Sequence, residues 1–509
     1  MLKFIDDFLN KITMYRIILY TLIFLFIISL ILSIFSVLPF TAVDLIASLL
    51  IILFTTWLVN IIFSYVYEAP INVESVYITA LILFFIITPA QGGVYSEFLP
   101  VAIWASIWSM ASKYILAIKN KHIFNPAAFA VTLTALTVGL SASWWIGTPS
   151  MLPFVLLSGL LVVRKIKRTD MVLSFSIGAI VMISILSIMK GGDVVNTIWQ
   201  TLTNSAFFFF AFIMLTEPLT APTTKWLRVA YGVLVGLLFA PALHIGSVYS
   251  TPELALVIGN IFAYIVSPKE KLLLKLKNRV KVGNDTYDFI FEKNRSLNFK
   301  PGQYMEWTLA HRDPDRRGNR RYFTIASSPT ESELHLGVKF YPEPSSFKNH
   351  LVALPLDGEI IAHQVSGDFV MPTDKKKGLV FIAGGIGVTP FRSMIKYLID
   401  TKENRDVTML YSNRAVADIS YKEVFDQAHK ELGIKTIYAV TNKGEVLNDV
   451  NMRGNPIDAA MIQKEVKDYT NKIYYISGPH GMVSSFEEML ESIGVPSQNI
   501  KTDFFPGFA

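Results

Sequence analysis

The pattern of apolar and polar positions changes character near Ser267-Pro268. Before that point, long apolar runs follow one another and are separated by short polar loops. Such a series indicates about ten membrane-spanning helices rather than the buried helices of a soluble protein. Several runs are shorter than the roughly 20 residues that a spanning helix needs, so a few should continue into polar flanks or be broken. The runs cover residues 17–38, 43–66, 76–87, 98–118, 126–145, 152–163, 171–189, 198–215, 229–243 and 254–266.

Basic residues are concentrated on alternate loops, namely those after the fourth, sixth, eighth and tenth runs. Because positively charged loops tend to stay in the cytoplasm, this predicts a multi-pass protein of the cell (inner) membrane with both termini cytoplasmic. The first run is long and lacks a small-residue cleavage site, which favours an uncleaved helix over a signal peptide. The basic loop residues are Lys119, Lys121, Arg164, Lys165, Lys167, Arg168, Lys225, Arg228, Lys269 and Lys271, and Lys190 is the main exception.

Composition narrows the possible functions. The 509 residues are 52% hydrophobic with a mean hydropathy of +0.43, and the excess lies before Ser267. The net charge of +6 follows from the loop pattern, so no nucleic-acid partner is implied. Zero cysteines exclude disulfides, cysteine-ligated iron–sulfur clusters and thiolate zinc sites within this chain. Only His122 and His244 lie in or near the membrane half, too few to ligate two stacked haems, and no metal site is expected.

From Ser267 onward the pattern is that of a soluble region of roughly 240 residues, enough for two compact units. Short alternating strands across residues 274–369 predict a small antiparallel barrel. The apolar strands that follow alternate with helical stretches, which predicts a parallel doubly wound sheet. Their sequences are LVFIAG, TMLYSN, IKTIYAV and KIYYISG.

A glycine-rich turn follows the first of these later strands, in GLVFIAGGIGVTPFRSM. Missing side chains at Gly384, Gly385 and Gly387 would let a pyrophosphate approach the backbone. Thr389 can cap the following helix and Pro390 suits its first position, so the turn is a candidate anion site. A plain connection between strand and helix is the alternative.

The segment RRYFTIASSP offers groups suited to a flavin dinucleotide. Arg321 can grip a diphosphate bidentately, Phe323 can lie on a flavin ring, and Thr324 can offer a hydroxyl or amide to a ring nitrogen. On one strand, Arg321 and Phe323 should face one side, and Tyr322 and Thr324 the other. An edge strand with a solvated arginine is the alternative interpretation of this sequence.

Six motifs in order resemble the ferredoxin–NADP⁺ reductase family across residues 274–509: PGQY, RYFTIASSP, GGIGVTP, LYSNR, SGPHGM and the tail DFFPGF. The resemblance implies that FAD is held by Arg321, Tyr322, Phe323, Thr324 and Ser327, with Ser346 near its phosphates and Phe504 or Phe505 near its ring. It implies that the nicotinamide dinucleotide lies on Gly384, Gly385, Gly387, Thr389 and Pro390, beside Arg414, Ser477, Gly478, Pro479 and Met482. Thr324, Ser477 and Phe505 would lie closest to the reacting rings.

Two positions bear on the chemistry of that resemblance. Many relatives have a cysteine where Ser477 stands beside the nicotinamide, and a serine keeps the contact with a less certain rate of hydride transfer. Arg414 could pair with a 2′-phosphate, yet relatives that use NADH also carry an arginine there. NADH is slightly favoured over NADPH, and both remain open.

The membrane half resembles the NqrB/RnfD flavoprotein subunits of sodium-translocating NADH:quinone reductase and of the Rnf complex, across residues 43–266. The resemblance rests on GGVYSEFLP, ILAIKNKHIFNPAAFAV and FIMLTEPLTAPTT. The third run ends FFIITPAQGG outside and the eighth ends FIMLTEPLTAP inside, as a five-plus-five inverted repeat would give. Prolines that simply break two helices are the alternative.

That family links FMN to a threonine in an S-G-A-T type sequence, which residues 125–151 lack. Covalent flavin is therefore not expected, and the resemblance leaves a noncovalent FMN or riboflavin, or a quinone, near Asn125, Pro126, Glu217 and Thr220. Asn-Pro and Glu-Pro pairs also start or stop helices without any ligand. The carboxylates of Asp44, Glu217 and Glu253 are near the ends of membrane runs, where they are either functional or merely hydrated.

The sequence thus predicts three domains: a transmembrane domain over residues 1–268, an FAD-binding β-barrel over 269–375, and an NAD(P)-binding α/β domain over 376–509. The expected function is hydride transfer from NAD(P)H to FAD in the cytoplasm, followed by electron transfer into the membrane to a flavin, a quinone or an extracytoplasmic partner. The alternative is a transporter of a small ligand whose reductase domain regulates or modifies the cargo.

Overall fold

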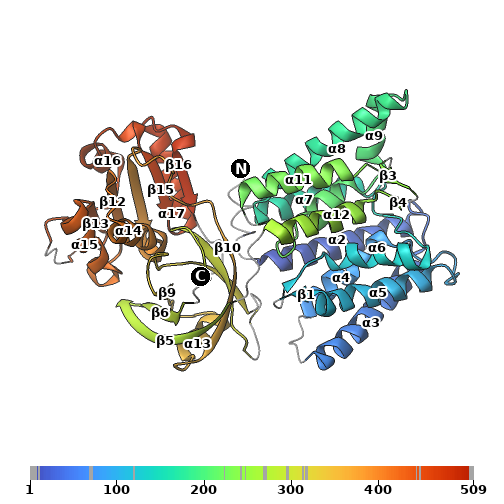
Figure 1. The fold of residues 1–509 in the computed structure, drawn as a ribbon, viewed down its shortest axis with the longest axis horizontal. Helices are drawn as coiled ribbons and strands as arrows, with labels where there is room; N and C mark the ends of the chain where they lie inside the picture. Colours follow the sequence, from blue (N-terminus) through green and yellow to red (C-terminus); the bar gives the residue numbers. More distant parts are fainter. Residues whose placement is uncertain are drawn as a thin grey trace. The chain divides into compact units, whose positions relative to one another are not determined.

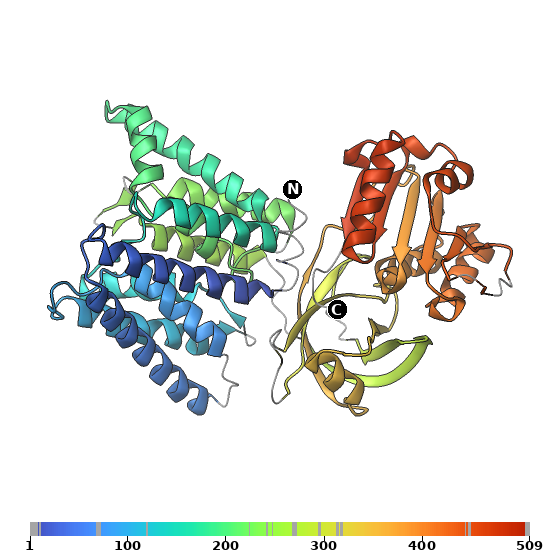
Figure 2. The same cartoon turned by 180° about the vertical axis from the view of Figure 1, so that it is seen from behind.

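The fold is that of a computed structural model. It describes Leu9 and residues 12–67, 73–118, 121–222, 224–240, 243–246, 248–266, 272–293, 297–311, 315, 319–442, 444–445 and 449–503. The chain divides into two compact units, Met1–Lys269 and Glu270–Ala509. The first is helical, and the second contains two β-sheets with helices (Figures 1 and 2).

The first unit consists of apolar helices that follow the apolar runs of the sequence. Those of its first half are α2 (Met14–Ile34), α3 (Ala42–Val66), α4 (Val73–Ile86), α5 (Phe98–Ile115) and α6 (Pro126–Val138). Those of its second half are α7 (Leu152–Ile166), α8 (Thr169–Met189), α9 (Val194–Thr203), α10 (Phe207–Phe209), the π-helix η1 (Phe210–Met214), α11 (Lys225–Leu238) and α12 (Pro252–Val266). Two short hairpins complete the unit: β1 (Ala117–Ile118) with β2 (Lys121–His122), and β3 (His244–Ile245) with β4 (Val248–Tyr249).

Among the described residues, the three helices α2, α3 and α8 are long and apolar enough to cross a membrane. Large apolar side chains on them, such as Phe54 and Ile177, are exposed on the outside of the unit. Apolar surface of this kind is costly in water and suits contact with lipid. An apolar helical half is confirmed, whereas the number of spanning segments stays a prediction.

Two of the apolar runs form interrupted helices, as expected for some of them. The run 198–215 is not one helix, because α9 ends at Thr203, Asn204–Ala206 form a bend, and α10 then leads into the π-helix. The run 126–145 is helical only to Val138, because Gly139 takes a left-handed conformation with φ of 75° and ends α6. The indole of Trp145 instead donates to the carbonyl of Phe84 at the end of α4.

The second unit begins with a six-stranded antiparallel sheet in the order β8-β7-β10-β5-β6-β9. Its strands are β5 (Leu272–Gly283), β6 (Thr286–Glu292), β7 (Tyr304–Thr308), β8 (Arg320–Thr324), β9 (Glu333–Lys339) and β10 (Glu359–Ser366). Alternating buried side chains such as Leu274 and Leu276 form one core with α13 (Ser346–Ala353). The predicted antiparallel sheet is confirmed, while its closure into a barrel stays a prediction.

The rest of this unit is a parallel sheet in the order β14-β13-β12-β11-β15-β16. Helices cover both faces, so the strands are buried and read as continuous apolar runs, as predicted for a doubly wound sheet. The strands are β11 (Leu379–Gly384), β12 (Val407–Asn413), β13 (Lys435–Val440), β14 (Met452–Arg453), β15 (Ile473–Ser477) and β16 (Ile500–Asp503). On one face lie α14 (Thr389–Thr401) and α15 (Lys422–Leu432), and on the other α16 (Ala459–Glu465) and α17 (His480–Ser492).

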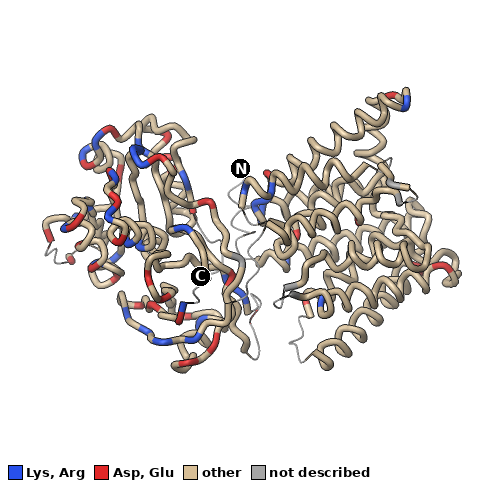
Figure 3. Tube along the Cα trace, in the orientation of Figure 1, with Lys and Arg blue, Asp and Glu red and all other residues tan. Residues whose placement is uncertain are grey.

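Charged residues are distributed differently over the two units. Figure 3 shows long stretches of the first unit without a charged residue, whereas both signs are spread over the second. An apolar unit with few charges suits a bilayer, and a mixed charged surface suits water.

Candidate functional site

The glycine-rich turn lies at the carboxyl edge of the parallel sheet, where β11 ends and a 3₁₀ turn over Gly385–Val388 leads into α14. Glycine is found at these three positions for different physical reasons. A Cβ on Gly384 would lie 2.2 Å from the sulfur of Met482, and a Cβ on Gly387 would lie 2.4 Å from the carbonyl oxygen of Ser477. Gly385 has φ of +52° and open space around it.

The structure adds a reason for glycine at two of these positions. Gly384 and Gly387 lack side chains where the protein's own segment Ser477–Met482 packs against them, and the approach of a ligand to them stays a prediction. Only Gly385 combines a left-handed backbone with an open approach. The packing nevertheless brings the predicted residues Ser477, Gly478, Pro479 and Met482 to the glycine turn, as the motifs implied.

Thr389 does not cap α14, contrary to expectation. The 3₁₀ turn makes the backbone helical before Thr389, so Val388 is the N-cap and Thr389 and Pro390 fill the first turn. The Thr389 hydroxyl donates instead to the carbonyl of Ile386 at 3.2 Å.

The strand ends place further candidates at this edge. Gly384 pairs with Ser412 on β12, Ala383 with Ser477 on β15, and Ser477 with Asp503 on β16. Arg414 follows Ser412 by two residues and its side chain is exposed. Because parallel strands end together, these residues share the edge where such sheets bind ligands. Phe504 and Phe505 lie outside the described residues.

Strand β8 places its side chains as alternation predicts. The guanidinium of Arg321 lies 5.3 Å above the ring of Phe347 on α13, and the ring of Phe323 lies 5.9 Å from the same ring. Arg321 and Phe323 therefore share a face. Tyr322 on the other face donates to Glu306 at 2.6 Å, and Thr324 is buried beside its pairing partner Tyr304.

Arg321 and the start of α13 hold the same carboxylate. Asp315 accepts a hydrogen bond from the backbone amide of Ser346 at 3.0 Å, and its other oxygen lies 3.5 Å from a guanidinium nitrogen of Arg321. The Ser346 hydroxyl accepts from the Asp315 amide at 2.9 Å and lies 3.0 Å from His311. A buried guanidinium and a helix N-terminus are donors suited to a diphosphate, and in this structure they bind the carboxylate of Asp315. These residues fit the phosphates of FAD.

The polar face of the sheet contains a buried acid that the sequence did not mark. Glu306 on β7 accepts from Tyr322, lies 2.9 Å from His363 on β10 and 3.6 Å from Arg320. Burial would raise the pKa of this carboxyl, but the charges of His363 and Arg320 and the hydrogen bonds outweigh it and lower the pKa to about 2. The cluster orients Tyr322, and the carboxyl of Glu306 remains ionised at neutral pH.

In the membrane-type unit, three of the four candidates meet. The side-chain amide of Asn125 donates to the carboxylate of Glu217 at 2.9 Å, and the hydroxyl of Thr220 donates to the same oxygen at 3.1 Å. Asn125 also caps α6, accepting from the amide of Ala128 at 3.0 Å, while Pro126 occupies the first helical position. The Asn-Pro pair therefore starts a helix and also binds the carboxylate.

Sequence reasoning missed two members of this cluster. Asn260, in the middle of α12, accepts from the backbone amide of Asn125 at 2.8 Å and donates to the hydroxyl of Tyr231 at 3.2 Å. His122 lies 3.7 Å from the second oxygen of Glu217. The available signal was a lone asparagine in an apolar run, because such a residue needs partners inside a membrane.

Other carboxylates of this unit also have partners. Asp44 accepts from the backbone amides of Gly92 and Gly93, and Glu253 accepts from the indole of Trp144 at 2.9 Å. Both acids are buried. They hold connections between helices together, which favours a structural role over simple hydration at a membrane surface.

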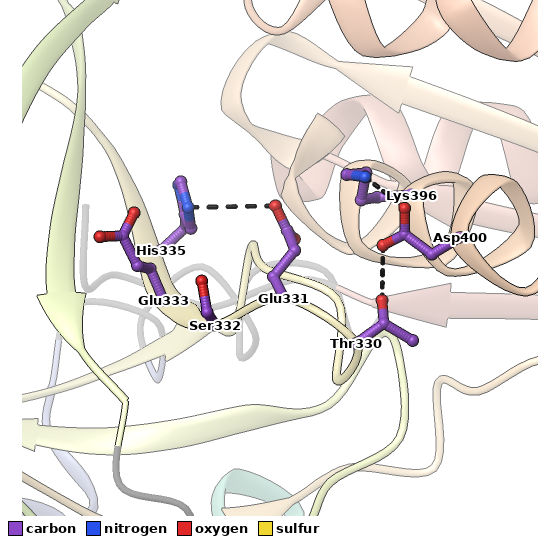
Figure 4. Close-up of a pocket in the computed structure, with 7 residues that line it drawn as sticks. All are labelled: Thr330, Glu331, Ser332, Glu333, His335, Lys396 and Asp400. Carbon is purple, nitrogen blue, oxygen red and sulfur yellow. Dashed lines mark hydrogen bonds and ion pairs between the residues drawn. The ribbon is translucent and has the colours of Figure 1, made fainter.

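A hollow of about 520 Å³ lies elsewhere in the second unit, between the loop before β9 and α14. Figure 4 shows Glu331 facing His335 on one side of it, and Asp400 contacting Lys396 and Thr330 on the other. None of its seven lining residues belongs to the candidate cofactor set.

Two protein families match this chain. Residues 99–270 match the NQR2, RnfD, RnfE family, and residues 381–488 match the oxidoreductase NAD-binding domain. Among curated proteins, the glycine betaine monooxygenase reductase subunit of Chromohalobacter salexigens is 26% identical over 237 residues, covering 44% of this chain and 62% of that protein. Oxidoreductase NAD-binding domain-containing protein 1 of Bos taurus is 29% identical over 227 residues, covering 41% of this chain and 71% of that protein. The chain thus spans less than two thirds of the first of these relatives.

Solved structures are similar at low identity. The flavohemoglobin from Malassezia yamatoensis, with bound FAD and heme, is 19% identical, with 69% of this chain and 97% of that chain covered and a TM-score of 0.43. The cytochrome b5 reductase domain of Ulva prolifera nitrate reductase is 21% identical, with 47% and 98% covered and a TM-score of 0.41. The two family matches confirm both resemblances drawn from the motifs, and the chain combines a segment that matches the NQR2, RnfD, RnfE family with a segment that matches the oxidoreductase NAD-binding domain.

Proposed function

We propose that this protein is a membrane-bound NAD(P)H-oxidising flavoprotein. The observation that carries the proposal is the anion seat formed by Arg321 and the Ser346 amide, because it has the donors that an FAD diphosphate needs. It belongs to the same unit as the glycine turn, which lies at the carboxyl edge of the parallel sheet. The two elements supply one place for a flavin and one for a nicotinamide dinucleotide.

The roles of the residues follow from their places. Arg321 and Ser346 hold the flavin phosphates, and Phe323 and Thr324 border the ring, with Tyr322 fixed from behind by Glu306. Gly385 offers its open backbone to the nucleotide phosphates, and Ser477, at the carboxyl end of β15, contacts the nicotinamide. When bound, FAD accepts electrons as a hydride pair and releases them singly.

Electrons then pass into the membrane unit in this proposal. The acceptor is a noncovalent flavin, a quinone or an extracytoplasmic partner, and the cluster of Asn125, Glu217 and Thr220 is its candidate site. The proposed topology has about ten spanning segments in a five-plus-five inverted repeat, with both termini in the cytoplasm. In this topology the reductase unit and the Glu217 end of the eighth run would both be on the cytoplasmic side of the membrane. A tethered donor meets its acceptor at high effective concentration.

Flavin content and nucleotide bleaching test the proposal. The whole chain is purified in detergent, its flavins are released and identified, and the visible band is followed under anaerobic NADH or NADPH. FAD that bleaches faster with NADH is the expected result, and a second releasable flavin that is reduced later would identify the acceptor. No bleaching by either nucleotide would overturn the reductase function.

One variant separates this function from a transporter with a regulatory reductase. Arg321→Ala should release FAD and abolish electron delivery to any membrane acceptor. Uptake of a small ligand into vesicles that persists unchanged in this variant would favour the transporter instead.

A further inference from the structure

The segment that follows β8 is fastened to the first turns of α14. Arg392 donates to the carbonyl of Ala326 at 3.1 Å and to one carboxylate oxygen of Glu331 at 2.8 Å, and it also contacts the other oxygen. The hydroxyl of Ser393 donates to the carbonyl of Ser327 at 2.6 Å. We call these contacts between residues 326–331 and α14 the seam.

Most of the seam is buried, and Ser327 and Glu331 make further hydrogen bonds. Arg392 is 6% exposed, and Ser327 and Ser393 are 0% exposed. Glu331 also accepts from the amide of Ser328 at 2.6 Å, and the hydroxyl of Ser327 accepts from the amide of His335 at 3.1 Å. A bidentate arginine–carboxylate pair out of water holds its partners in one geometry.

A second contact supports the same junction from Tyr421, the N-cap residue of α15. The guanidinium of Arg392 lies 5.6 Å from the ring centre of Tyr421. A Cβ on Gly337 of β9 would lie 2.5 Å from the Tyr421 hydroxyl and 2.8 Å from the methyl group of Thr389. Strand β9 therefore lies directly against the beginning of α14, with no room for a side chain between them.

The seam joins the two candidate cofactor elements over short stretches of chain. Ala326 follows Thr324 by two residues, and Arg392 follows Thr389 by three. A shift of α14 against β8 would therefore change the distance between flavin and nicotinamide. Hydride transfer needs reacting atoms about 3–3.5 Å apart, and an error of about 1 Å can cost about a hundredfold in rate.

We infer that Arg392, Glu331 and Ser393 are positioning residues that set the separation of the flavin and nicotinamide rings. The inference rests on the proposed function, because it takes β8 as the flavin strand and the glycine turn as the nucleotide site. None of the three residues belongs to the candidate cofactor-binding set. They act through Ala326 and Ser327 on one side and through the helical backbone of α14 on the other.

The test uses the whole chain in detergent with the variants Glu331→Gln and Ser393→Ala. Glu431→Gln is the matched control, because Glu431 is exposed on α15 and bonded only to Gln427 among the contacts described. FAD content, the dissociation constant for NADH, and the rate of flavin bleaching after rapid mixing are measured for each. The isotope effect with NADH deuterated at the transferred hydrogen reports on the hydride step itself.

Both variants should retain FAD and bind NADH within about threefold of the native chain, while bleaching slows by about tenfold or more and the isotope effect rises. Arg392→Lys should slow bleaching less than these two variants do, because lysine keeps the positive charge although it loses the bidentate geometry. A bleaching rate within twofold of native, or a rate that falls only in proportion to lost FAD, would overturn the inference. If Glu331→Gln fails to fold, Ser393→Ala decides.

Failure of the proposed function gives a different pattern. Retention of FAD by Arg321→Ala, or unchanged NADH binding by Gly387→Ala, would remove the assignment of the cofactor elements. A slower hydride step in the seam variants, with both cofactors still bound, would support the positioning role independently of those two measurements.

Discussion

Gly387 and Ser477 are in backbone contact, so close that a Cβ on the glycine would lie 2.4 Å from the serine carbonyl oxygen. Gly387→Ala should therefore shift the glycine turn away from β15. We expect a loss of about 1–3 kcal/mol in the free energy of unfolding and at least about tenfold weaker NADH binding. Gly481→Ala is the control, because a Cβ there meets nothing within 4 Å. Titration calorimetry and denaturant unfolding compare the two, and equal behaviour would contradict the packing argument.

The Asp315 carboxylate occupies the seat that we assign to the FAD diphosphate. Since FAD must displace it, Asp315→Ala should lower the dissociation constant for FAD by roughly three- to tenfold. Reconstitution of flavin-depleted protein, followed by flavin fluorescence, measures that constant. Glu343→Ala, at an exposed loop position, should leave the constant unchanged. Weaker binding of FAD in the Asp315 variant would mean that this carboxylate supports the site.

Glu306 predicts a loss of stability at acid pH. Its pKa is lowered from the ordinary 4.5 to about 2, so its contribution to stability is complete above about pH 4.5 and is lost as pH falls towards 2. Denaturant unfolding of the second unit, followed between pH 2.5 and 6, should therefore show stability falling with pH in the native chain.

The variant Glu306→Gln should change both the level and the slope of that curve. At pH 7 it should be destabilised by about 3 kcal/mol, because His363 and Arg320 lose their charged partner. Its stability should depend less on pH between 2.5 and 4.5. A slope equal to that of the native chain would assign the acid sensitivity to other groups.

The contact between Asn125 and Glu217 predicts a defect restricted to the membrane step. Glu217→Gln and Asn125→Ala should leave FAD reduction by NADH within about twofold, while electron transfer to the membrane acceptor falls by about tenfold or more. Stopped-flow bleaching measures the first step, and reoxidation by a water-insoluble quinone in proteoliposomes measures the second. Asp193→Asn, at the exposed start of α9, is the control. Unaltered reoxidation in both variants would remove the cluster from the electron path.

Local patterns predicted the features that depend on one element. Alternation placed Arg321 and Phe323 on one face of β8, and Phe347 contacts both. The motifs also placed Ser477 beside the glycine turn. In the membrane unit, the family resemblance assigned Asn125 and Glu217 to one candidate site, and the two residues, 92 positions apart, are hydrogen-bonded.

Features set by tertiary packing could not be predicted in the same way. Asn260 has no motif, and its role depends on α12 passing Asn125 and Tyr231. Asp315 belongs to a polar stretch of sequence that contains no motif predicting its contact with Ser346. The reason for glycine at positions 384 and 387 depends on how closely the segment after β15 approaches.

The π-helix at Phe210–Met214 ends three residues before Glu217. A π turn accommodates one residue more than an α-helical turn, and each residue of a regular helix turns the chain by about 100°. Removing one residue, for example Ala211, would let the segment relax into an ordinary α-helix of the same length. Because a π turn absorbs its extra residue within that one turn, the carboxylate of Glu217 would keep its direction towards Asn125. A deletion at this place would thus remove the π turn without disconnecting the cluster, and would separate any role of the turn from that of the cluster side chains.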